Sequence, residues 1–494
     1  MGYLLGIDLG TSSLRAALIE RTGKTVAIAG REYPILTPHK DWAEQDPEHW
    51  WQALKYSIQL IFKQSKINSC EIKGIGFSGQ MHGLVAVDRS GRCLRNAIPW
   101  IDKRSQKECE QLKAKIGQER LYRITGIPVF PGFLLPSLLW IRKNEPGIYD
   151  RIFRILSPKD YLRSRLTGEF LSEPTDGCAT LLMDVSRREW SAEVLSKTGI
   201  SGSIMPELVE SGSIAGRITK TAAEDTGLTA GTRAVAGGGD QAMGAIGMGM
   251  VEPGLAASVL GTGGQFITAV KRPVLDPKQR IHTLCHAMPG NWILMGAILS
   301  AGLSLRWLRD SFLKENYSRF DEYAKKAPAG SDGLTFFPYL LGERTPYMDP
   351  DLKGCFYGIT LAHNKCHLIR AVMEGVTFSM KGSLDIFREL GVKVGRVVAS
   401  GGGAKSDFWK QMQADIYNRN IYGVDRQEHS VYGAALLAGV GTGIFRNLKE
   451  ACSKRIKYSL SNKPQRANAG TYAGIDKTRK ILVQKLLQLT TGEK

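Results

Sequence analysis

The chain has 494 residues, too many for a single hydrophobic core, and 43% of them are hydrophobic, an ordinary share for a globular protein. We therefore expect two large domains. Asp240 and Glu252 interrupt the longest stretch of small and apolar residues, and the N-terminus lacks the basic lead-in of a signal peptide. The sequence thus argues against a membrane protein and against secretion.

The formal net charge is +19, and the residues from 446 to the end contribute +9 of it. A nucleic-acid-binding protein more typically places its basic residues beside aromatic stacking residues or on a reader helix. We therefore expect no nucleic-acid partner and interpret the excess as a solvated basic surface that also suits anionic nucleotides. Eight scattered cysteines without a C-x-x-C motif favour reduced thiols and a cytoplasmic location.

Two similar strand–turn–strand units lie about 250 residues apart. Residues 4–9 form an apolar strand, Gly10–Ser13 a small-residue turn, and residues 14–19 a second strand. Residues 256–270 repeat this pattern around Gly261-Thr262-Gly263-Gly264. Both units predict a β-hairpin, and such turns can present backbone N–H groups to an anion. Two of them could hold one polyphosphate from two sides, although most turns of this kind are ordinary turns.

The region that follows the first hairpin alternates between helix and strand. Asp46 and Pro47 form a typical helix start, and an apolar stripe at helical spacing follows them. The stripe consists of Trp50, Leu54, Ile58 and Ile61. We expect a strand over residues 73–78 that runs into Gly79–Gly83, and we expect residues 84–87 to continue this strand.

Residues 235–247 place one carboxylate, Asp240, in an otherwise small and uncharged stretch. An apolar lead-in and three glycines predict a strand that ends in a tight turn, and a buried helix start follows. Asp240 is either the cap of this helix or a general base for a substrate hydroxyl. This stretch alone favours the cap, and only the rest of the chain favours the base.

A glycine triplet also marks the C-terminal half. Residues 397–400 predict a strand that ends in Gly401–Lys405, before a helix carrying Phe408, Met412 and Ile416. Glycines between a strand and a helix permit close approach of a nucleotide, although neither the dinucleotide fingerprint nor the Walker motif is present. Residues 459–473 are predicted to be a loop, and residues 473–489 a terminal helix.

These motifs resemble the FGGY family of carbohydrate kinases, and the resemblance covers essentially the whole chain. Residues 354–374 are similar to the family's C-terminal signature, and the motifs at residues 8–13, 240, 261–263 and 401–405 follow the family's order. The resemblance implies an α/β fold of two actin-like (ribonuclease H-like) domains with a nucleotide and sugar cleft between them. We place these domains at residues 1–246 and 247–494, the first carrying the sugar site and the second the ATP site.

Residues 42–47, 79–83 and 341–346 are similar to the xylulokinase branch of the family. This resemblance implies ATP-dependent phosphorylation of D-xylulose to D-xylulose 5-phosphate. Ile101 and Ser137 depart from the residues usual in this branch and in the family, which bears on fine sugar preference. The alternatives are a sibling kinase for another pentulose or a hexose, or a catalytically silent, sugar-responsive ATP-binding module. A homodimer is left open as the assembly.

The resemblance also implies roles for individual residues. Asp240 would be the general base, and Asp8 would hold Mg²⁺. The implied sugar contacts are Met81, His82, Trp100, Asp102 and Asp240. The implied ATP contacts are Thr11, Ser12, Ser13, Arg15, Gly261, Thr262, Gly263, Gly401, Gly402, Gly403 and Lys405. The cleft between the domains would close on the sugar and exclude water.

Overall fold

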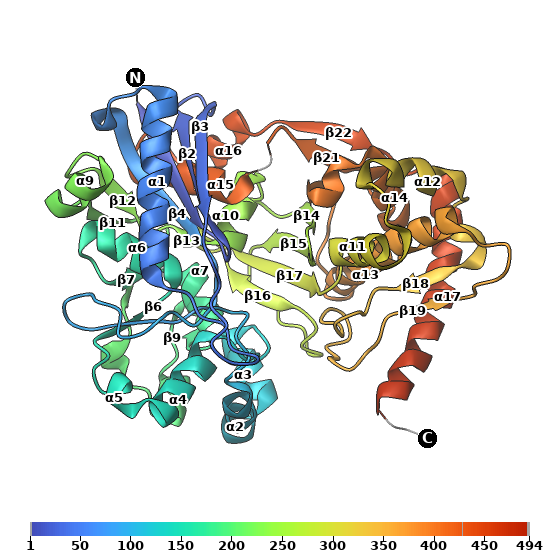
Figure 1. Cartoon of the computed structure of the whole chain (residues 1–494), viewed down its shortest axis with the longest axis horizontal. Helices are drawn as coiled ribbons and strands as arrows, with labels where there is room; N and C mark the ends of the chain where they lie inside the picture. The colour runs from blue at the N-terminus through green and yellow to red at the C-terminus, as the bar shows by residue number, and fades with distance from the viewer. Residues whose placement is uncertain (1, 427, 492–494) are drawn as a thin grey trace.

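The computed structural model describes residues 2–426 and 428–491 and contains two large mixed β-sheets (Figure 1). The first sheet has the order β11-β12-β4-β1-β2-β3, with β13 also paired to β4. Its strands are β1 (Tyr3–Leu9), β2 (Ser13–Glu20), β3 (Thr25–Glu32), β4 (Ile72–Gly79), β11 (Ile214–Arg217), β12 (Arg233–Val235) and β13 (Gly238–Gly239).

The second sheet repeats the core of the first. Its order is β16-β17-β15-β14-β20-β21-β22. Its strands are β14 (Leu255–Leu260), β15 (Gly264–Val270), β16 (His282–Cys285), β17 (Trp292–Ile298), β20 (Arg396–Gly401), β21 (Ile421–Val424) and β22 (Tyr458–Asn462). In each sheet a strand pairs antiparallel with the next strand of its hairpin and parallel with a later strand, as β1 does with β2 and β4, and β14 with β15 and β20. The two predicted hairpins are confirmed.

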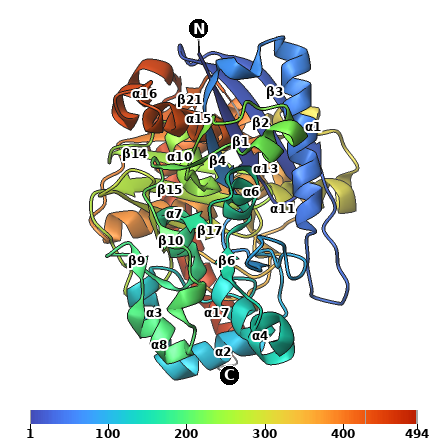
Figure 2. The ribbon, with the colours of Figure 1, turned by 90° about the vertical axis from the view of Figure 1, so that its left-hand side faces the viewer.

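Helices cover both sheets, and a smaller group of short helices and strands lies below the first sheet (Figures 1 and 2). The principal helices are α1 (Pro47–Ser65), α6 (Pro158–Thr167), α9 (Lys220–Thr226), α10 (Asp240–Gly247), α11 (Gly302–Leu308), α12 (Phe320–Lys326), α13 (Lys365–Glu389), α14 (Asp407–Tyr417), α15 (His429–Gly441), α16 (Leu448–Arg455) and α17 (Arg466–Thr491). The smaller group includes the helices α2 (Gln106–Ile116), α3 (Gln118–Thr125), α4 (Leu134–Asn144), α5 (Pro146–Tyr149), α7 (Pro174–Gly177) and α8 (Ala192–Thr198).

The short strands form two-stranded ladders outside the large sheets. They are β5 (Val85–Val87), β6 (Arg154–Leu156), β7 (Leu171–Ser172), β8 (Met183–Asp184), β9 (Glu189–Trp190), β10 (Glu207–Leu208), β18 (Thr335–Phe337) and β19 (Cys355–Tyr357).

Helix α1 begins where the sequence predicts it. The Asp46 side chain accepts a hydrogen bond from the Glu48 N–H at 2.9 Å, and Pro47 occupies the first turn. The stripe predicted from Trp50 to Ile61 is buried. The helix that the cap and the apolar spacing predict is therefore confirmed.

Helix α15 joins the C-terminal part of the chain to the first sheet. It packs against β1 and β4 and crosses α10, which follows the glycine turn before Asp240. A Cβ atom at Gly433 would lie 1.9 Å from the Met243 carbonyl oxygen, so only glycine permits this crossing. Ser430 Oγ donates to the Asp240 carbonyl oxygen at 3.2 Å. The division of domains at residue 246 remains a prediction.

Two predicted elements were wrong. Residues 84–87 do not continue β4, because His82 takes a positive φ of 72° and redirects the chain, and β5 then pairs with β6. Residues 459–473 are not a loop, because β22 pairs with β21 and α17 already begins at Arg466. Asn468 at the start of α17 donates to Asp415 Oδ2 at 3.0 Å, which is a tertiary contact that sequence periodicity does not show. Within residues 2–426 and 428–491, no helix is both long enough and apolar enough for a membrane crossing.

Candidate active site

The carboxyl ends of three neighbouring strands bring two carboxylates together. Strands β1 and β13 both run parallel to β4, and both Asp8 and Gly238 lie opposite Ser78. Asp240 follows β13 directly and begins α10. Because parallel strands place their carboxyl ends at one edge of a sheet, Asp8 and Asp240 share that edge, a common position for ligand sites in α/β folds.

Three glycines before Asp240 make the turn possible. Gly237 has a φ of +83°, which side chains rarely adopt. A Cβ atom at Gly238 would lie 2.9 Å from Thr175 Oγ1, and one at Gly239 would lie 2.6 Å from Met81 Cγ. The turn therefore packs closely between Thr175 and Met81, and this packing fixes where Asp240 begins its helix.

Asp240 does not cap α10 with its side chain. The N-cap position belongs to Gly239, and no side-chain hydrogen bond caps the helix within the described part of the chain. Burial, together with the negative charge of Asp8, raises the pKa of Asp240 to about 7. A carboxylate that titrates near neutral pH can accept a proton and release it again, as a general base must.

Asp8 has an oxygen that is available for a ligand. Burial and the nearby charge of Glu428 raise the pKa of Asp8, and its Oδ1 atom is shielded from solvent without a hydrogen-bond partner among the described residues. Mg²⁺ binds oxygen ligands and commonly uses one or two carboxylates, with phosphate oxygens and water completing its shell. The Asp8 and Asp240 carboxylates fit such an ion.

A cavity of about 140 Å³ lies beside Asp240, between segments outside the strands of the first sheet and strands β15, β16 and β17 of the second. The lining residues are Thr11, Met81, His82, Trp100, Phe133, Asp240, Gln241, Gln265, His282, Met295, Ala297 and Arg344. We call this space the smaller cavity. The structure thus brings Met81, His82, Trp100 and Asp240 together, as the sequence predicts, and adds Thr11, which was expected at the nucleotide.

His82 is held in a single orientation. Its Nδ1 atom lies 2.7 Å from the Ala179 carbonyl oxygen, and its ring stacks on Phe133 with centroids 3.9 Å apart. Burial lowers the pKa of His82 to about 4, so the ring is neutral at pH 7. A neutral ring that donates from Nδ1 to a carbonyl carries a bare Nε2 atom, which can accept a hydrogen bond from a hydroxyl group.

Asp102 lies outside the lining of the smaller cavity. It is fully buried, and its carboxylate accepts hydrogen bonds from the Ala43 N–H at 2.7 Å and from Arg104 Nε at 3.0 Å. Trp100 Nε1 donates to Thr11 Oγ1 at 2.9 Å and joins two walls of the cavity. Asp102 therefore joins the Ala43 segment to Arg104, and its prediction as a sugar contact is wrong, because its carboxylate is occupied by these donors outside the cavity lining.

Sequence reasoning gave no place in the cavity to His282, Gln265, Arg344 or Phe133, although Arg344 lies within the motif at residues 341–346. His282 is 2% exposed, and neither of its ring nitrogens finds a hydrogen-bond partner within residues 2–426 and 428–491. Burial, with Arg344 and His82 close by, lowers its pKa well below the usual value. The two-residue period of a strand shows that residues alternate between faces, but not which face meets the cavity, so the sequence carried no signal for His282.

A larger cavity of about 650 Å³ lies along the second sheet. Predicted nucleotide contacts that line it are Gly261, Thr262, Gly402, Gly403 and Lys405. The remaining walls include Leu305, Tyr317, Phe320, Met373 and Trp409. Apolar walls beside a glycine-rich edge suit a flat base with attached phosphates.

The other predicted nucleotide contacts lie on the two hairpin turns or next to the larger cavity. Gly263 closes the turn of β14 and β15 through its carbonyl oxygen, which accepts from the Gly261 N–H at 3.0 Å. Gly401 has a φ of +78° and approaches Leu260 closely. Ser12 and Ser13 lie at the turn of the first hairpin, and Arg15 on β2 forms an ion pair with Glu428.

Comparison with known families matches both halves of the chain. Residues 3–247 match the N-terminal domain of the FGGY family of carbohydrate kinases, and residues 256–442 match its C-terminal domain. The Asp8 and Asp240 edge lies in the first match, and the glycine edge of the larger cavity lies in the second.

Individual relatives agree with this assignment. A xylulose kinase of Bacillus subtilis is 38% identical over 96% of this chain and 95% of its own length. A gluconokinase of the same species is 32% identical over 89% of this chain and 88% of its length. A crystal structure described as a xyloylose kinase from Brucella ovis is 36% identical, covers 99% of this chain and 100% of its own, and superposes with a TM-score of 0.92. The chain is therefore a sugar kinase and belongs to the FGGY family of carbohydrate kinases.

Proposed function

We propose that this sugar kinase phosphorylates D-xylulose at O5 with ATP. The identity of 38% to a xylulose kinase, across nearly the whole of both chains, carries this proposal. The smaller cavity supports it, because the bare Nε2 atom of the neutral His82 ring suits a sugar hydroxyl group. Met81, His82 and Trp100 contact the ketose.

Asp240 acts as the general base in this proposal. Its carboxylate accepts the proton of the O5 hydroxyl while that oxygen forms its bond to the γ-phosphorus and the bond from the γ-phosphorus to the bridging oxygen breaks. The proton then passes from Asp240 to solvent when the product leaves. In phosphoryl transfer, positioning and charge neutralisation supply most of the rate, and a positioned base adds about 10²- to 10⁴-fold.

Asp8 holds Mg²⁺ in this proposal, directly or through water, with its Oδ1 atom, which has no hydrogen-bond partner among the residues that the structure describes. When bound, the ion supplies neutralisation of negative charge on the transferring phosphate. The contribution of Asp8 itself is to keep an oxygen ligand fixed beside Asp240, at the shared edge of the first sheet.

The glycine-rich turns bind ATP in this proposal. Backbone N–H groups of Thr11, Ser12 and Ser13, with Arg15 on the following strand, face the phosphates from the first sheet. Those of Thr262 and Gly263 face them from the second, in the turn that the bond from the Gly261 N–H to the Gly263 carbonyl oxygen holds in shape. Gly401, Gly402, Gly403 and Lys405 border the adenosine in the larger cavity, where 650 Å³ of space and apolar walls support a bound base.

A substrate panel tests the proposed function. ADP release is measured in a coupled assay with ATP and one of D-xylulose, D-ribulose, gluconate or glycerol, each over a range of concentrations. We expect kcat/KM for D-xylulose to exceed the values for the other substrates by about tenfold or more. A substrate whose hydroxyl groups do not match the site leaves buried polar groups of the protein without a hydrogen bond, and this disfavours its reaction. A preference for gluconate would assign a sibling kinase activity. ADP release that no sugar stimulates would indicate a silent ATP-binding module.

A further inference from the structure

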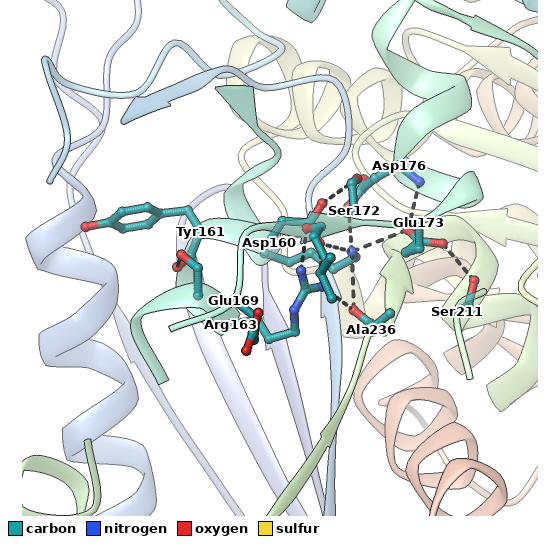
Figure 3. A network of polar contacts seen from close by, with 12 residues as sticks. Asp160, Tyr161, Arg163, Glu169, Ser172, Glu173, Asp176, Ser211 and Ala236 are labelled. Carbon is teal, nitrogen blue, oxygen red and sulfur yellow. Dashed lines mark hydrogen bonds and ion pairs between the residues drawn. The ribbon is translucent and has the colours of Figure 1, made fainter. Parts of the chain in front are cut away.

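A cluster of charged side chains is buried next to Ala236, the residue that precedes the three glycines before Asp240 (Figure 3). It consists of Lys159, Asp160, Arg163, Glu173 and Asp176, each with 0% of its surface exposed. We call these five residues the buried ionic cluster. Such a cluster requires an explanation, because removing a charge from water costs several kcal/mol even where a partner is present.

The contacts within the buried ionic cluster are close. Lys159 Nζ lies 2.6 Å from Asp160 Oδ1, 3.0 Å from Asp176 Oδ2 and 3.3 Å from Glu173 Oε1. Arg163 Nη1 lies 2.8 Å from the same Asp160 oxygen. Burial, opposed by Lys159 and reinforced by the other two carboxylates, raises the pKa of Asp176 well above its usual value. The protonated form of Asp176 leaves two cations against two carboxylates, which balances the charge.

The cluster contacts Ala236, the residue directly before the glycine turn. Arg163 Nη1 donates to the Ala236 carbonyl oxygen at 2.9 Å, and Lys159 Nζ lies 3.5 Å from the same oxygen. The next residue is held indirectly, because the Gly237 N–H donates to the Ser211 carbonyl oxygen at 2.9 Å and Ser211 Oγ donates to Glu173 Oε2 at 2.7 Å.

Thr175 links the cluster to the residue just before Asp240. Its hydroxyl donates to Glu173 Oε1 at 2.8 Å and accepts from the Gly239 N–H at 2.8 Å. Glu173 also accepts from the backbone N–H groups of Thr175 and Asp176, so its carboxylate is fixed by several donors. The Thr175 hydroxyl is therefore held between the Glu173 carboxylate and the Gly239 N–H, and it ties Gly239 to the cluster.

Stability alone does not explain the cluster. Replacing a buried ion pair by apolar residues of similar volume is often neutral or stabilising, so such groups are weak evidence for a contribution to folding. Charged, multiply bonded side chains do define positions sharply, however. A displacement of about 1 Å at a reacting group can reduce a rate by about a hundredfold. The turn that the cluster contacts leads directly to Asp240, whose carboxylate must lie at the correct distance from the reacting hydroxyl group.

We propose that the buried ionic cluster positions Asp240 for proton transfer, and that Thr175 is the positioning residue that carries its geometry to the Gly239 N–H. This inference rests on the proposed role of Asp240 as the base. Thr175 touches neither sugar nor ATP in this account, so its loss changes the rate of the chemical step and leaves substrate binding intact.

Three variants of the whole 494-residue chain test the inference. Thr175→Val keeps the side-chain volume and removes the hydroxyl, whereas Thr175→Ser keeps the hydroxyl. Thr226→Val is the control, because Thr226 is also buried and its hydroxyl bonds locally, donating to the Ala222 carbonyl oxygen of α9 and accepting from the Leu228 N–H at 3.3 Å, away from the glycine turn. The measurements are kcat, the KM values for D-xylulose and for ATP, and the melting temperature.

We expect Thr175→Val to lose about tenfold or more in kcat, with both KM values within about twofold of wild type, and Thr175→Ser to recover most of the loss. Thr226→Val should keep wild-type kcat even where its melting temperature falls as far as that of Thr175→Val. Unchanged kcat in Thr175→Val would overturn the inference, as would equal losses in the valine and serine variants or an equal loss in Thr226→Val.

If Thr175→Val does not fold, Thr175→Ala removes the same hydroxyl and carries the same expectations. Asp240→Asn, measured alongside, separates the two proposals. Wild-type turnover in Asp240→Asn would overturn the proposed base itself. A large loss in Asp240→Asn with wild-type kcat in Thr175→Val would overturn only the positioning role.

Discussion

Asp8 on β1 and Asp240 directly after β13 lie at the same edge of the first sheet, and the charge of Asp8 adds to burial in raising the pKa of Asp240 to about 7. Two carboxylates in one partly buried site disfavour each other's ionised forms. This relationship gives the proposed base a pKa near neutral pH and leaves an Asp8 oxygen available for a cation.

The pH dependence of turnover follows from this relationship. Asp240 accepts a proton only in its ionised form, so without Mg²⁺ effects kcat/KM should rise with pH and level off above about 7. Bound Mg²⁺ favours the ionised form and should shift the rise to lower pH. The measurement is kcat/KM for D-xylulose at low and at saturating Mg²⁺, over a range of about pH 5 to 9 that extends to both sides of this pKa. A rate that falls as pH rises through this range would contradict the assignment.

The same carboxylate should affect folding stability. The folded-state pKa of Asp240 is raised above the usual 3.8. Its favourable contribution to the free energy of unfolding is therefore present in full below pH 3.8 and is lost as pH rises through about 7. The Asn side chain of Asp240→Asn does not ionise, so the variant does not lose this stability as the pH rises. In metal-free buffer its melting temperature should therefore exceed that of wild type at pH 8, by more than at pH 5. Calorimetry checks this, and a variant that melts below wild type at pH 8 would contradict it.

His282 should contribute to sugar binding rather than to stability. Its buried ring nitrogens have no partner among the described residues, so His282→Leu removes an unsatisfied polar group and should leave the melting temperature unchanged or higher. The KM for D-xylulose should rise about fivefold or more, with the KM for ATP little changed, as expected for one lost polar contact.

His286→Leu is the matched control for this variant. His286 is equally buried, but its Nε2 lies 2.9 Å from the Met250 carbonyl oxygen and its Nδ1 accepts from the Met288 N–H at 2.9 Å. This substitution should lower the melting temperature and leave the KM for D-xylulose unchanged. If the two variants behave alike, His282 is an ordinary core residue.

Sugar binding should bring the two sheets closer together. The smaller cavity takes His82 from the first half of the chain and His282 from the second, so a bound ketose contacts both. We expect saturating D-xylulose to reduce the radius of gyration in small-angle scattering, and ATP alone to reduce it less. An unchanged radius in active protein would exclude closure driven by the sugar.

The sequence predicted the hairpins, α1 and the position of Asp240, because local signals determine them: glycine turns, a proline at a helix start and apolar spacing. It did not predict that the Asp102 carboxylate binds Arg104 and the Ala43 N–H, or that His282 lines the smaller cavity. Both depend on which distant segments meet. The sequence also did not predict that α15 packs on β1 and β4. The apolar sequence of this helix indicates that it is buried, but not which surface covers it.

The most direct test of the account is the turnover of Asp240→Asn with D-xylulose. Asp225→Asn, a change of an exposed carboxylate on α9, is the control. We predict that Asp240→Asn folds and binds D-xylulose and ATP with near wild-type affinity, while its kcat falls by about 10²- to 10⁴-fold and that of the control does not. Turnover within about twofold of wild type in purified Asp240→Asn would contradict the account.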